Sequence, residues 1–469
     1  MKNLSLSRSA ALTTARGGGL FAATLAAALA GGIAIAGAGQ AGSMQSESTA
    51  PESARVAFLA DNVSLAGMNY AGTALPPGEG KNVLDREKRD DPKPPRWFHY
   101  SIRLGGRFLY SDNINAARVD PLEDFILSLE PGLSIGIGDV PGRAESYIRL
   151  DYSPNALLFA DNSEFNIIQH FIHLEALAKL GRLSLTFSQD IQFLEGTEFD
   201  FNNPNNFGDP SDPNNRRNRD VSGRNEFEFY ATALGLRYDF NDKASLDSGL
   251  NYSRSTFSGL FTTEVYSGYA FFDYKLTPQL KIGAGGAAGE VGFDDENAEE
   301  TFQEVRGRFT YDIPKKFNIN GSAGVEFRQF GPLGRANFSA PIAELGVTFE
   351  PIEGTKLFAN ARHRTYVSNA LLGQNFQVNA FSGGLEQRLS DRLSFRVVTG
   401  YETADYFSTL MEVEAEREDE FFFVDASLDL KITKIWSAGV FYIHRDNDSN
   451  LVPFGFVENQ IGVRTGIAF

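Results

Sequence analysis

Cysteine is absent from the 469 residues, which excludes a disulfide framework, thiol catalysis and a lipid anchor on cysteine. Histidine is scarce at 5 residues and tryptophan at 2. The histidines are scattered, and the sequence shows no Ser/His/Asp arrangement, zinc-ligand spacing or phosphate-binding glycine loop. We therefore expect neither an enzyme nor a protein with a metal site or a cofactor.

Positive charge and apolar runs are also in short supply. The formal net charge is −17, which argues against a nucleic acid partner, because nucleic acid binds to a basic face. The mean hydropathy of −0.24 excludes a bundle of membrane helices. A membrane β-barrel stays open as an interpretation, because half of each barrel strand faces away from lipid.

The longest apolar run, 20–35, lies near the amino terminus behind Lys2, Arg8 and Arg16. A basic start, an apolar stretch and a small-x-small site at 36–38 together predict a secretory signal peptide over 1–38. The alternative is an uncleaved helical anchor, because the run approaches the ~20 residues that span a bilayer.

Residues 39–97 are rich in Ser, Ala and Gly, then in Pro and charged residues, and their apolar residues follow no strand or helix period. Such a segment buries too little apolar surface to offset its ordering entropy. The composition predicts a disordered periplasmic leader, and a plug inside a pore is the alternative.

From residue 98 onward, apolar and polar residues alternate in segments of about 10–15 residues, the length of a membrane-crossing strand with some overhang. Tight turns alternate with long polar connections, as in membrane barrels. The pattern predicts an all-β fold over 98–469, a closed antiparallel transmembrane β-barrel of about eighteen strands (roughly 16–18). The predicted strands are 98–110, 123–137, 143–152, 165–180, 182–194, 224–239, 244–255, 262–275, 279–291, 301–312, 316–329, 340–350, 355–366, 374–389, 391–404, 419–431, 434–445 and 456–469.

The last strand alternates strictly. Ile461, Val463, Ile467 and the terminal Phe469 share an apolar face, and small or charged residues share the other. This resembles the closing strand of bacterial outer-membrane β-barrels, in which a terminal Phe with apolar residues at alternate positions is the assembly signal. The resemblance implies the outer membrane of a Gram-negative bacterium, contact with its lipid and recognition by the barrel-assembly machinery.

In the sixth predicted strand, Phe227 and Phe229 have the opposite parity from Leu234, Leu236 and Tyr238. This change of parity predicts either a β-bulge or aromatic side chains that point inward.

Charged residues keep to one parity in the clearest strands, and a charge on the lipid face costs roughly 2–4 kcal/mol near the midplane. We therefore assign the charged parity to a pore-lining face. Its mixed signs suit either a structural wall of ion pairs or an oxyanion-selective surface built on Arg forks. The predicted pore-lining residues are Arg103, Arg107, Arg149, Asp151, Asp190, Arg306, Arg308, Glu326, Arg328, Glu344, Arg362, Arg364, Arg396, Asp425, Asp429, Glu458 and Arg464, and the same reasoning adds Arg254.

The first hairpin carries a more specific resemblance. It contains Tyr110-Ser-Asp-Asn-Ile114, then Asp124-Phe-Ile126, then Glu130-Pro-Gly132. These groups are similar to the opening hairpin of the family of outer-membrane beta-barrel porins often linked to exopolysaccharide loci. The resemblance implies a barrel without an assigned enzymatic activity.

Three functions follow as hypotheses. The first is a porin-like channel that passes polar or small anionic solutes through a charged lumen. The second is an exporter of a secreted polysaccharide, because eighteen strands leave an aqueous channel. The third is a structural or adhesive barrel at the cell surface without transport.

Overall fold

The computed structural model describes residues 97–138, 146–196, 220, 223–294, 298–314 and 316–469. These residues belong to one compact unit, Pro51–Phe469. The predicted signal peptide and all but the last residue of the predicted leader lie outside them. Within these ranges, no helix has both the length and the apolar character needed to cross a membrane.

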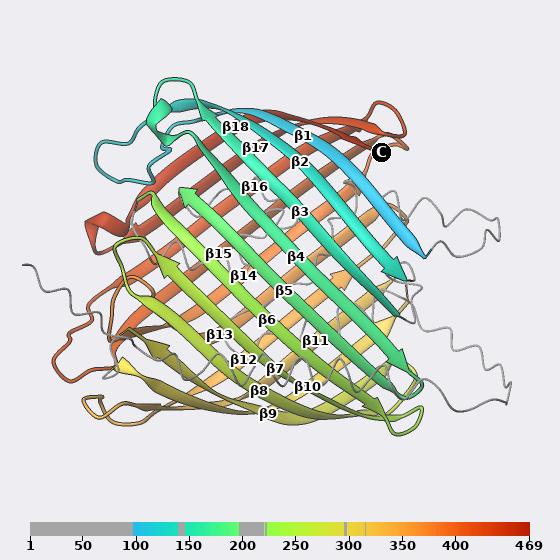
Figure 1. Cartoon of the computed structure of the whole chain (residues 1–469), viewed down its shortest axis with the longest axis vertical. Coiled ribbons are helices and arrows are strands. Elements are labelled where there is room, and N and C mark those ends of the chain that lie inside the picture. Colours follow the sequence, from blue (N-terminus) through green and yellow to red (C-terminus); the bar gives the residue numbers. More distant parts are fainter. Residues whose placement is uncertain (1–96, 139–145, 197–219, 221–222, 295–297, 315) are drawn as a thin grey trace, which may run out of the picture. The chain divides into compact units, whose positions relative to one another are not determined.

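The strands follow one another along the chain and pair antiparallel with their sequence neighbours, and β18 also pairs with β1, so the sheet closes into a ring (Figure 1). The closing register places Arg107 opposite Arg464 and Phe108 opposite Val463. The predicted closed antiparallel barrel of about eighteen strands is confirmed. The strands are β1 Phe98–Ser111, β2 Asp124–Gly138, β3 Ser146–Phe159, β4 Ile167–Leu180, β5 Leu183–Gly196, β6 Asn225–Asp239, β7 Ala244–Phe257, β8 Thr262–Lys275, β9 Leu280–Phe293, β10 Glu300–Ile313, β11 Phe317–Phe330, β12 Phe338–Phe349, β13 Thr355–Val367, β14 Gln374–Arg388, β15 Leu393–Ser408, β16 Glu418–Lys431, β17 Trp436–Ser449 and β18 Phe456–Ala468, with short 3-10 helices η3 Ser163–Phe165 and η5 Val452–Phe454.

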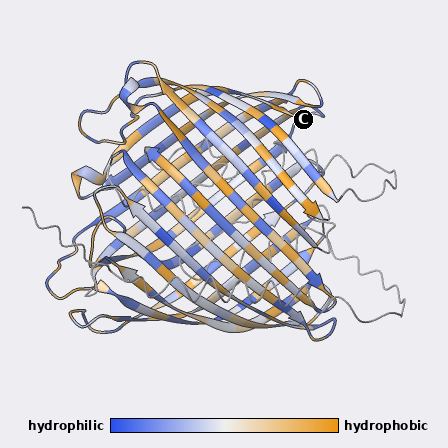
Figure 2. Ribbon diagram, in the orientation of Figure 1, coloured by the Kyte–Doolittle hydropathy of each residue, from blue (hydrophilic) through white to orange (hydrophobic). Residues whose placement is uncertain are grey.

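Successive side chains of a strand point to opposite faces of the sheet, and the sequence uses this strictly. On β1, Tyr100, Ile102 and Leu104 are exposed on the outer face, whereas Ser101 and Arg107 are buried on the inner face. Hydrophobic and hydrophilic bands therefore alternate along the strands in Figure 2. A register shift of one residue would exchange the two faces, so this pattern fixes the strand pairing.

The third strand is longer than predicted. The predicted strand was 143–152, but β3 runs from Ser146 to Phe159. Pro154 lies inside the ladder opposite His170 of β4. Proline has no N–H to donate, and Pro154 lies where the register of β3 with β2 is interrupted: the pairs with β2 stop at Tyr152 and resume at Ala156.

Strands β15 and β17 also run about four residues beyond their predicted ends, to Ser408 and Ser449. The register of β16 with β17 continues through Asp446 and Asp448, both on the outer parity. Above the hydrocarbon region the outer face needs no apolar side chains, so the alternation ends before the hydrogen-bonded ladder does.

The two ends of the barrel differ in their connections. One end, here the turn end, has short turns in which a side chain binds the backbone two and three residues later. At 240–243 the Oδ1 of Asn241 accepts hydrogen bonds from the N–H groups of Lys243 and Ala244, both 2.9 Å long, and Thr277, Ser390 and Thr433 do the same in their turns. Local side-chain bonds of this kind favour turns over strand continuation.

The other end, here the loop end, carries the long connections, which bind one another. Gly334 and Leu410 form a β-bridge between two different loops. The N–H of Thr409 donates to the carbonyl of Gly373 at 2.8 Å, which joins a third loop. Because tight turns face the periplasm and long loops face outward in membrane barrels, we assign the loop end to the cell surface.

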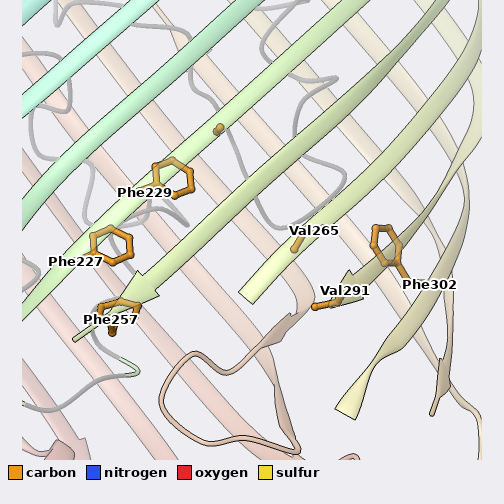
Figure 3. Packing of buried hydrophobic residues seen from close by; sticks show 7 residues of the cluster. Phe227, Phe229, Phe257, Val265, Val291 and Phe302 are labelled. Carbon is orange, nitrogen blue, oxygen red and sulfur yellow. The ribbon is translucent and has the colours of Figure 1, made fainter. Parts of the chain in front are cut away.

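The parity change in β6 reflects inward-pointing aromatic rings and no bulge. The registers of β6 with β5 and β7 are continuous. Phe227 and Phe229 are buried and pack with Phe257, Val265 and Phe302 inside the barrel (Figure 3). Of the two alternatives for this strand, the inward-pointing aromatics are the correct one.

Candidate functional site: the barrel interior

The strand registers place every residue of the predicted pore-lining set on the inner parity. Arg107 and Arg464 face each other across β1 and β18, and Arg306 lies across from Gly324 on β11. The added residue Arg254 is a wrong assignment, because it pairs with Tyr230 and Glu264 on the outer parity. It lies three residues from the loop end of β7, where an outward charge reaches the headgroup region and avoids the cost of the hydrocarbon core.

The densest ion-pair network lies on β10 to β13. The guanidinium of Arg364 binds Glu304 at 2.6 Å and Glu344 at 3.1 Å. Arg306 approaches the same Glu304 at 3.2 Å. The side chains of Arg364 and Glu304 are 3% and 0% exposed, so these charges compensate one another away from water.

Two further clusters extend this network along the wall. Arg328 binds Glu326 at 2.6 Å and also Glu300. Arg308 binds Asp273 at 2.7 Å and Asp247 at 3.2 Å, and its guanidinium lies 4.2 Å from the centre of the Phe271 ring.

Ion pairs continue around the ring on β1 to β5 and on β14 to β18. The remaining predicted residues join them in the following contacts: Arg107–Glu130 at 2.7 Å, Arg149–Asp151 at 2.8 Å, His173–Asp190 at 2.7 Å, Arg396–Asp425 at 3.5 Å, Arg445–Glu458 at 3.3 Å and Arg464–Asp429 at 2.6 Å. Arg103 instead donates to Ser153 at 3.4 Å, and the guanidinium of Arg362 lies 6.0 Å from the Tyr366 ring centre. The geometry is that of a compensated wall, with carboxylates of the same or a nearby strand beside most of these guanidinium groups.

Close to the loop end, the inner face is aromatic where a barrel lumen is usually polar. We call this layer the aromatic collar; it consists of Phe227, Phe229, Phe257, Phe302, Tyr366, Phe376, Tyr406, Phe421, Phe423 and Phe456, all buried. Ring centres of Phe227 and Phe257 are 4.4 Å apart, and those of Phe376 and Tyr406 are 4.7 Å apart. Loop residues Ala116, Leu371 and Ala415 pack against it.

Sequence reasoning identified only the β6 part of the aromatic collar. The signal was present elsewhere, since each of these aromatics falls on the charged parity within a few residues of a loop. Gly400 shows the consequence for packing: a Cβ there would lie 2.4 Å from the ring of Phe423 on the next strand. Glycine is needed at that position because the inward ring covers the neighbouring backbone.

Above the aromatic collar, Asp220 and Arg417 join three connections. Asp220, in the connection between β5 and β6, accepts hydrogen bonds from the hydroxyls of Ser368 and Tyr406 at 2.9 Å. Arg417 donates to the carbonyl of Asp220 at 2.9 Å and binds the Asp419 carboxylate at 2.6 Å.

The Arg417 side chain is 0% exposed, and its guanidinium lies 3.6 Å from the centre of the Phe454 ring. Burial alone lowers the pKa of an arginine, but Tyr406, Asp419 and Asp220 raise the pKa of Arg417 above its ordinary value. The residue therefore stays charged and serves as the central bond donor between the loops.

The outer face decides where the molecule resides. Large apolar side chains such as Val305, Phe381 and Val463 are exposed there on most strands. Near the loop end, outward tyrosines bind carboxylates, as Tyr401 does to Glu420 at 2.8 Å, and near the turn end Trp436 is 42% exposed. An apolar band between two aromatic girdles on a closed barrel is the surface that membrane lipid requires.

The chain is an outer-membrane β-barrel. No protein-family model matches it, and no curated protein sequence matches it. Solved structures with a similar fold include the FrpB iron transporter from Neisseria meningitidis (F3-3 variant), with 12% identity and a TM-score of 0.41, covering 75% of this chain and 62% of that one. Pseudomonas aeruginosa OpdO has 10% identity and a TM-score of 0.41, covering 79% and 97%. OpdK from the same organism has 9% identity and a TM-score of 0.41, covering 79% and 98%.

At its turn end the outer-membrane barrel has a recess of about 350 Å³ on the inner face of β13 to β16 and β18. It is lined by charged residues that include Lys356, Glu386, Arg396, Lys431 and Arg464. This turn-end recess opens toward the periplasm, because the tight turns at 350–354 and 389–392 form its rim.

In the described part of the barrel, the recess included, no group of three or more His, Asp or Glu residues could hold a metal ion. His170 and His173 lie on opposite faces of β4, since Pro154 pairs with the first and Asp151 with the second.

Proposed function

We propose that the protein is a porin-like channel that passes polar or anionic solutes across the outer membrane through its charged interior. The observation that carries this proposal is the closed ring of eighteen strands with a charged inner face. Barrels with 16 to 18 strands are wide enough to leave an aqueous channel. Inner-face charges with part of their side chain exposed, such as Arg396 and Arg464 at 20% and 19%, are favourable beside water.

The ion pairs limit how selective such a wall is. Arg306, Arg308 and Arg364 have carboxylates within 3.2 Å, so their positive potential is largely cancelled in the lumen. We therefore propose two different roles for the predicted pore-lining residues. The compensated pairs hold the wall together, and less compensated cations at the turn end provide a modest preference for anions.

The other two hypotheses remain predictions. Among the residues that the structure describes, no feature of the interior favours export of a secreted polysaccharide, or a purely structural or adhesive role, over a channel. Assembly by the barrel-assembly machinery through Ile461, Val463, Ile467 and Phe469 also remains a prediction. Three of these side chains are 52–60% exposed on the outer face, where such machinery would reach them.

Proteoliposome swelling tests the channel directly. Liposomes that contain the purified, folded barrel should swell in isotonic arabinose and in isotonic sodium glucuronate, and liposomes without protein should not. Insertion is verified by the resistance of the folded barrel to protease. If liposomes with inserted protein swell at the protein-free rate for both solutes, the channel hypothesis is wrong and the structural or adhesive barrel remains.

A further inference from the structure

The turn-end recess reverses the charge balance of the chain. The whole chain has 43 Lys and Arg residues against 60 Asp and Glu residues. Of the ionisable side chains that line the recess, the cations outnumber the anions. The cations are Lys356, Arg388, Arg392, Arg396, Lys431 and Arg464, and the anions are Glu350, Glu386, Asp391 and Asp429. A positive recess on an acidic protein attracts anions where the rest of the surface repels them.

Two of these cations are committed to short ion pairs. Arg464 holds Asp429 with two hydrogen bonds, at 2.6 and 2.9 Å. Arg388 binds Glu353 on the rim at 2.8 Å. Lys431 and Arg392, by contrast, are exposed and take part in no ion pair among the residues that the structure describes.

Arg396 is held loosely although it is largely buried. Its guanidinium lies 3.6 Å from Glu386 and 3.5 Å from Asp425, and its side chain is 20% exposed. The Nε of Arg396 and the Oε2 of Glu386 are both buried without a hydrogen-bond partner. Lys356 approaches Glu386 only to 3.9 Å. A donor and an acceptor are thus left unsatisfied side by side in the wall of the recess, each costly to bury in that state.

We propose that the turn-end recess binds a small hydroxylated carboxylate, of the sugar-acid class, from the periplasmic side. The ligand carboxylate takes the guanidinium of Arg396 and the ammonium of Lys431, and a ligand hydroxyl donates to the carboxylate of Glu386, to which Lys356 and Arg396 are held only at 3.9 and 3.6 Å. Planar guanidinium groups suit carboxylates because two N–H groups match two oxygens. The volume of about 350 Å³ lies at the lower end of small-molecule sites, which fits a single sugar ring.

This inference rests on the proposed channel only for its biological meaning, and its test measures binding without transport. Titration calorimetry of the full-length folded protein in detergent micelles uses sodium glucuronate as the probe and glucose as the neutral ligand of similar shape. We expect glucuronate to bind in the millimolar range or tighter and to weaken as sodium chloride rises, because exposed charges are screened. Glucose should give no measurable heat.

Variants locate the bound carboxylate. Arg396→Gln should weaken glucuronate binding at least about tenfold, the loss expected for a charge-assisted hydrogen bond. Lys431→Gln, at an exposed position that cannot compromise folding, should weaken it several-fold. Arg182→Gln, which removes another arginine of the turn end outside the recess, should leave binding unchanged.

A second probe distinguishes a free sugar acid from the end of an acidic polysaccharide. If trigalacturonate binds more tightly than glucuronate, the recess takes the end of an acidic chain. If trigalacturonate binds equally or more weakly, the recess takes a free sugar acid. Both results support a carboxylate site. Three results would overturn the proposal and leave water between Arg396 and Glu386. They are equal binding of glucuronate and glucose, unchanged glucuronate binding in both recess variants, and no glucuronate binding at all. Binding without liposome swelling would overturn the channel and keep the recess.

Discussion

Replacing Arg364 with Gln should destabilise the barrel strongly, because this side chain neutralises two carboxylates of the inner wall. Its guanidinium lies 2.6 Å from Glu304 and 3.1 Å from Glu344, and Arg364 and Glu304 are 3% and 0% exposed. Removing one partner of a buried ion pair leaves the other charge uncompensated, which costs about 3–5 kcal/mol. The nearby Arg306, 3.2 Å from Glu304, compensates part of the loss and places the expected value near the lower figure, about 3 kcal/mol.

Urea titration of the folded barrel, followed by the fluorescence of Trp97 and Trp436, measures the free energy of unfolding. The matched control is Arg388→Gln on the adjacent strand. Arg388 pairs with Glu353, and the two side chains are 50% and 91% exposed. An exposed pair contributes about 0–1 kcal/mol, so this variant should unfold close to the wild type.

Removing the carboxylates together with both arginines should restore most of the lost stability. The quadruple variant, with Arg306, Arg364, Glu304 and Glu344 all changed to Gln, leaves none of these four charges without its partner, and replacing a whole buried ion network is often neutral. If Arg364→Gln and Arg388→Gln lower the free energy of unfolding equally, the network lies in water and the description of a compensated, buried wall is wrong.

Two further changes test the terminus and the loops. Phe469→Asp should reduce outer-membrane insertion several-fold more than Ala468→Asp, because the Phe469 ring is 59% exposed on the apolar outer register and Ala468 faces inward; equal surface levels of both variants would refute the assembly role. Arg417→Gln should speed chymotrypsin cleavage at the loop end of barrels in liposomes several-fold, because the buried guanidinium joins Asp220 to Asp419. The exposed Arg118→Gln is its control, and equal cleavage rates in the two variants would show that the loops hold together without Arg417.

Most of the barrel could be predicted from the sequence because lipid imposes a period of two on every strand. Phe108 and Val463, or Tyr401 and Phe422, can lie only on the outer face once their charged neighbours lie inside. That constraint gave the strand number and the inner parity of the charged residues. It ends at the headgroup region, which is why Arg254 and the outer ends of β15 and β17 were predicted wrongly.

The candidate site was less predictable, since parity tells which face a side chain occupies and nothing about its partners. Arg306 and Arg308 look like a free cationic pair in the sequence, yet Glu304 of the same strand binds the first and Asp273, two strands away on β8, binds the second. The contact between Asp220 and Arg417 spans 197 residues, so only the closed ring brings the two together. The turn-end recess likewise depends on how the two turns at 350–354 and 389–392 meet at the rim.

The conductance of the purified, full-length barrel in a planar lipid bilayer decides whether the barrel is a channel. We expect discrete, reproducible current steps on insertion. Under a gradient of potassium chloride, we expect the reversal potential at about 0.1 M salt to show a preference for anions. The reversal potential should move toward zero near 1 M, because the screening length falls from about 10 Å at 0.1 M to about 3 Å at 1 M. A bilayer current that stays at the baseline after verified insertion of folded protein would contradict the claim that this outer-membrane barrel is a channel.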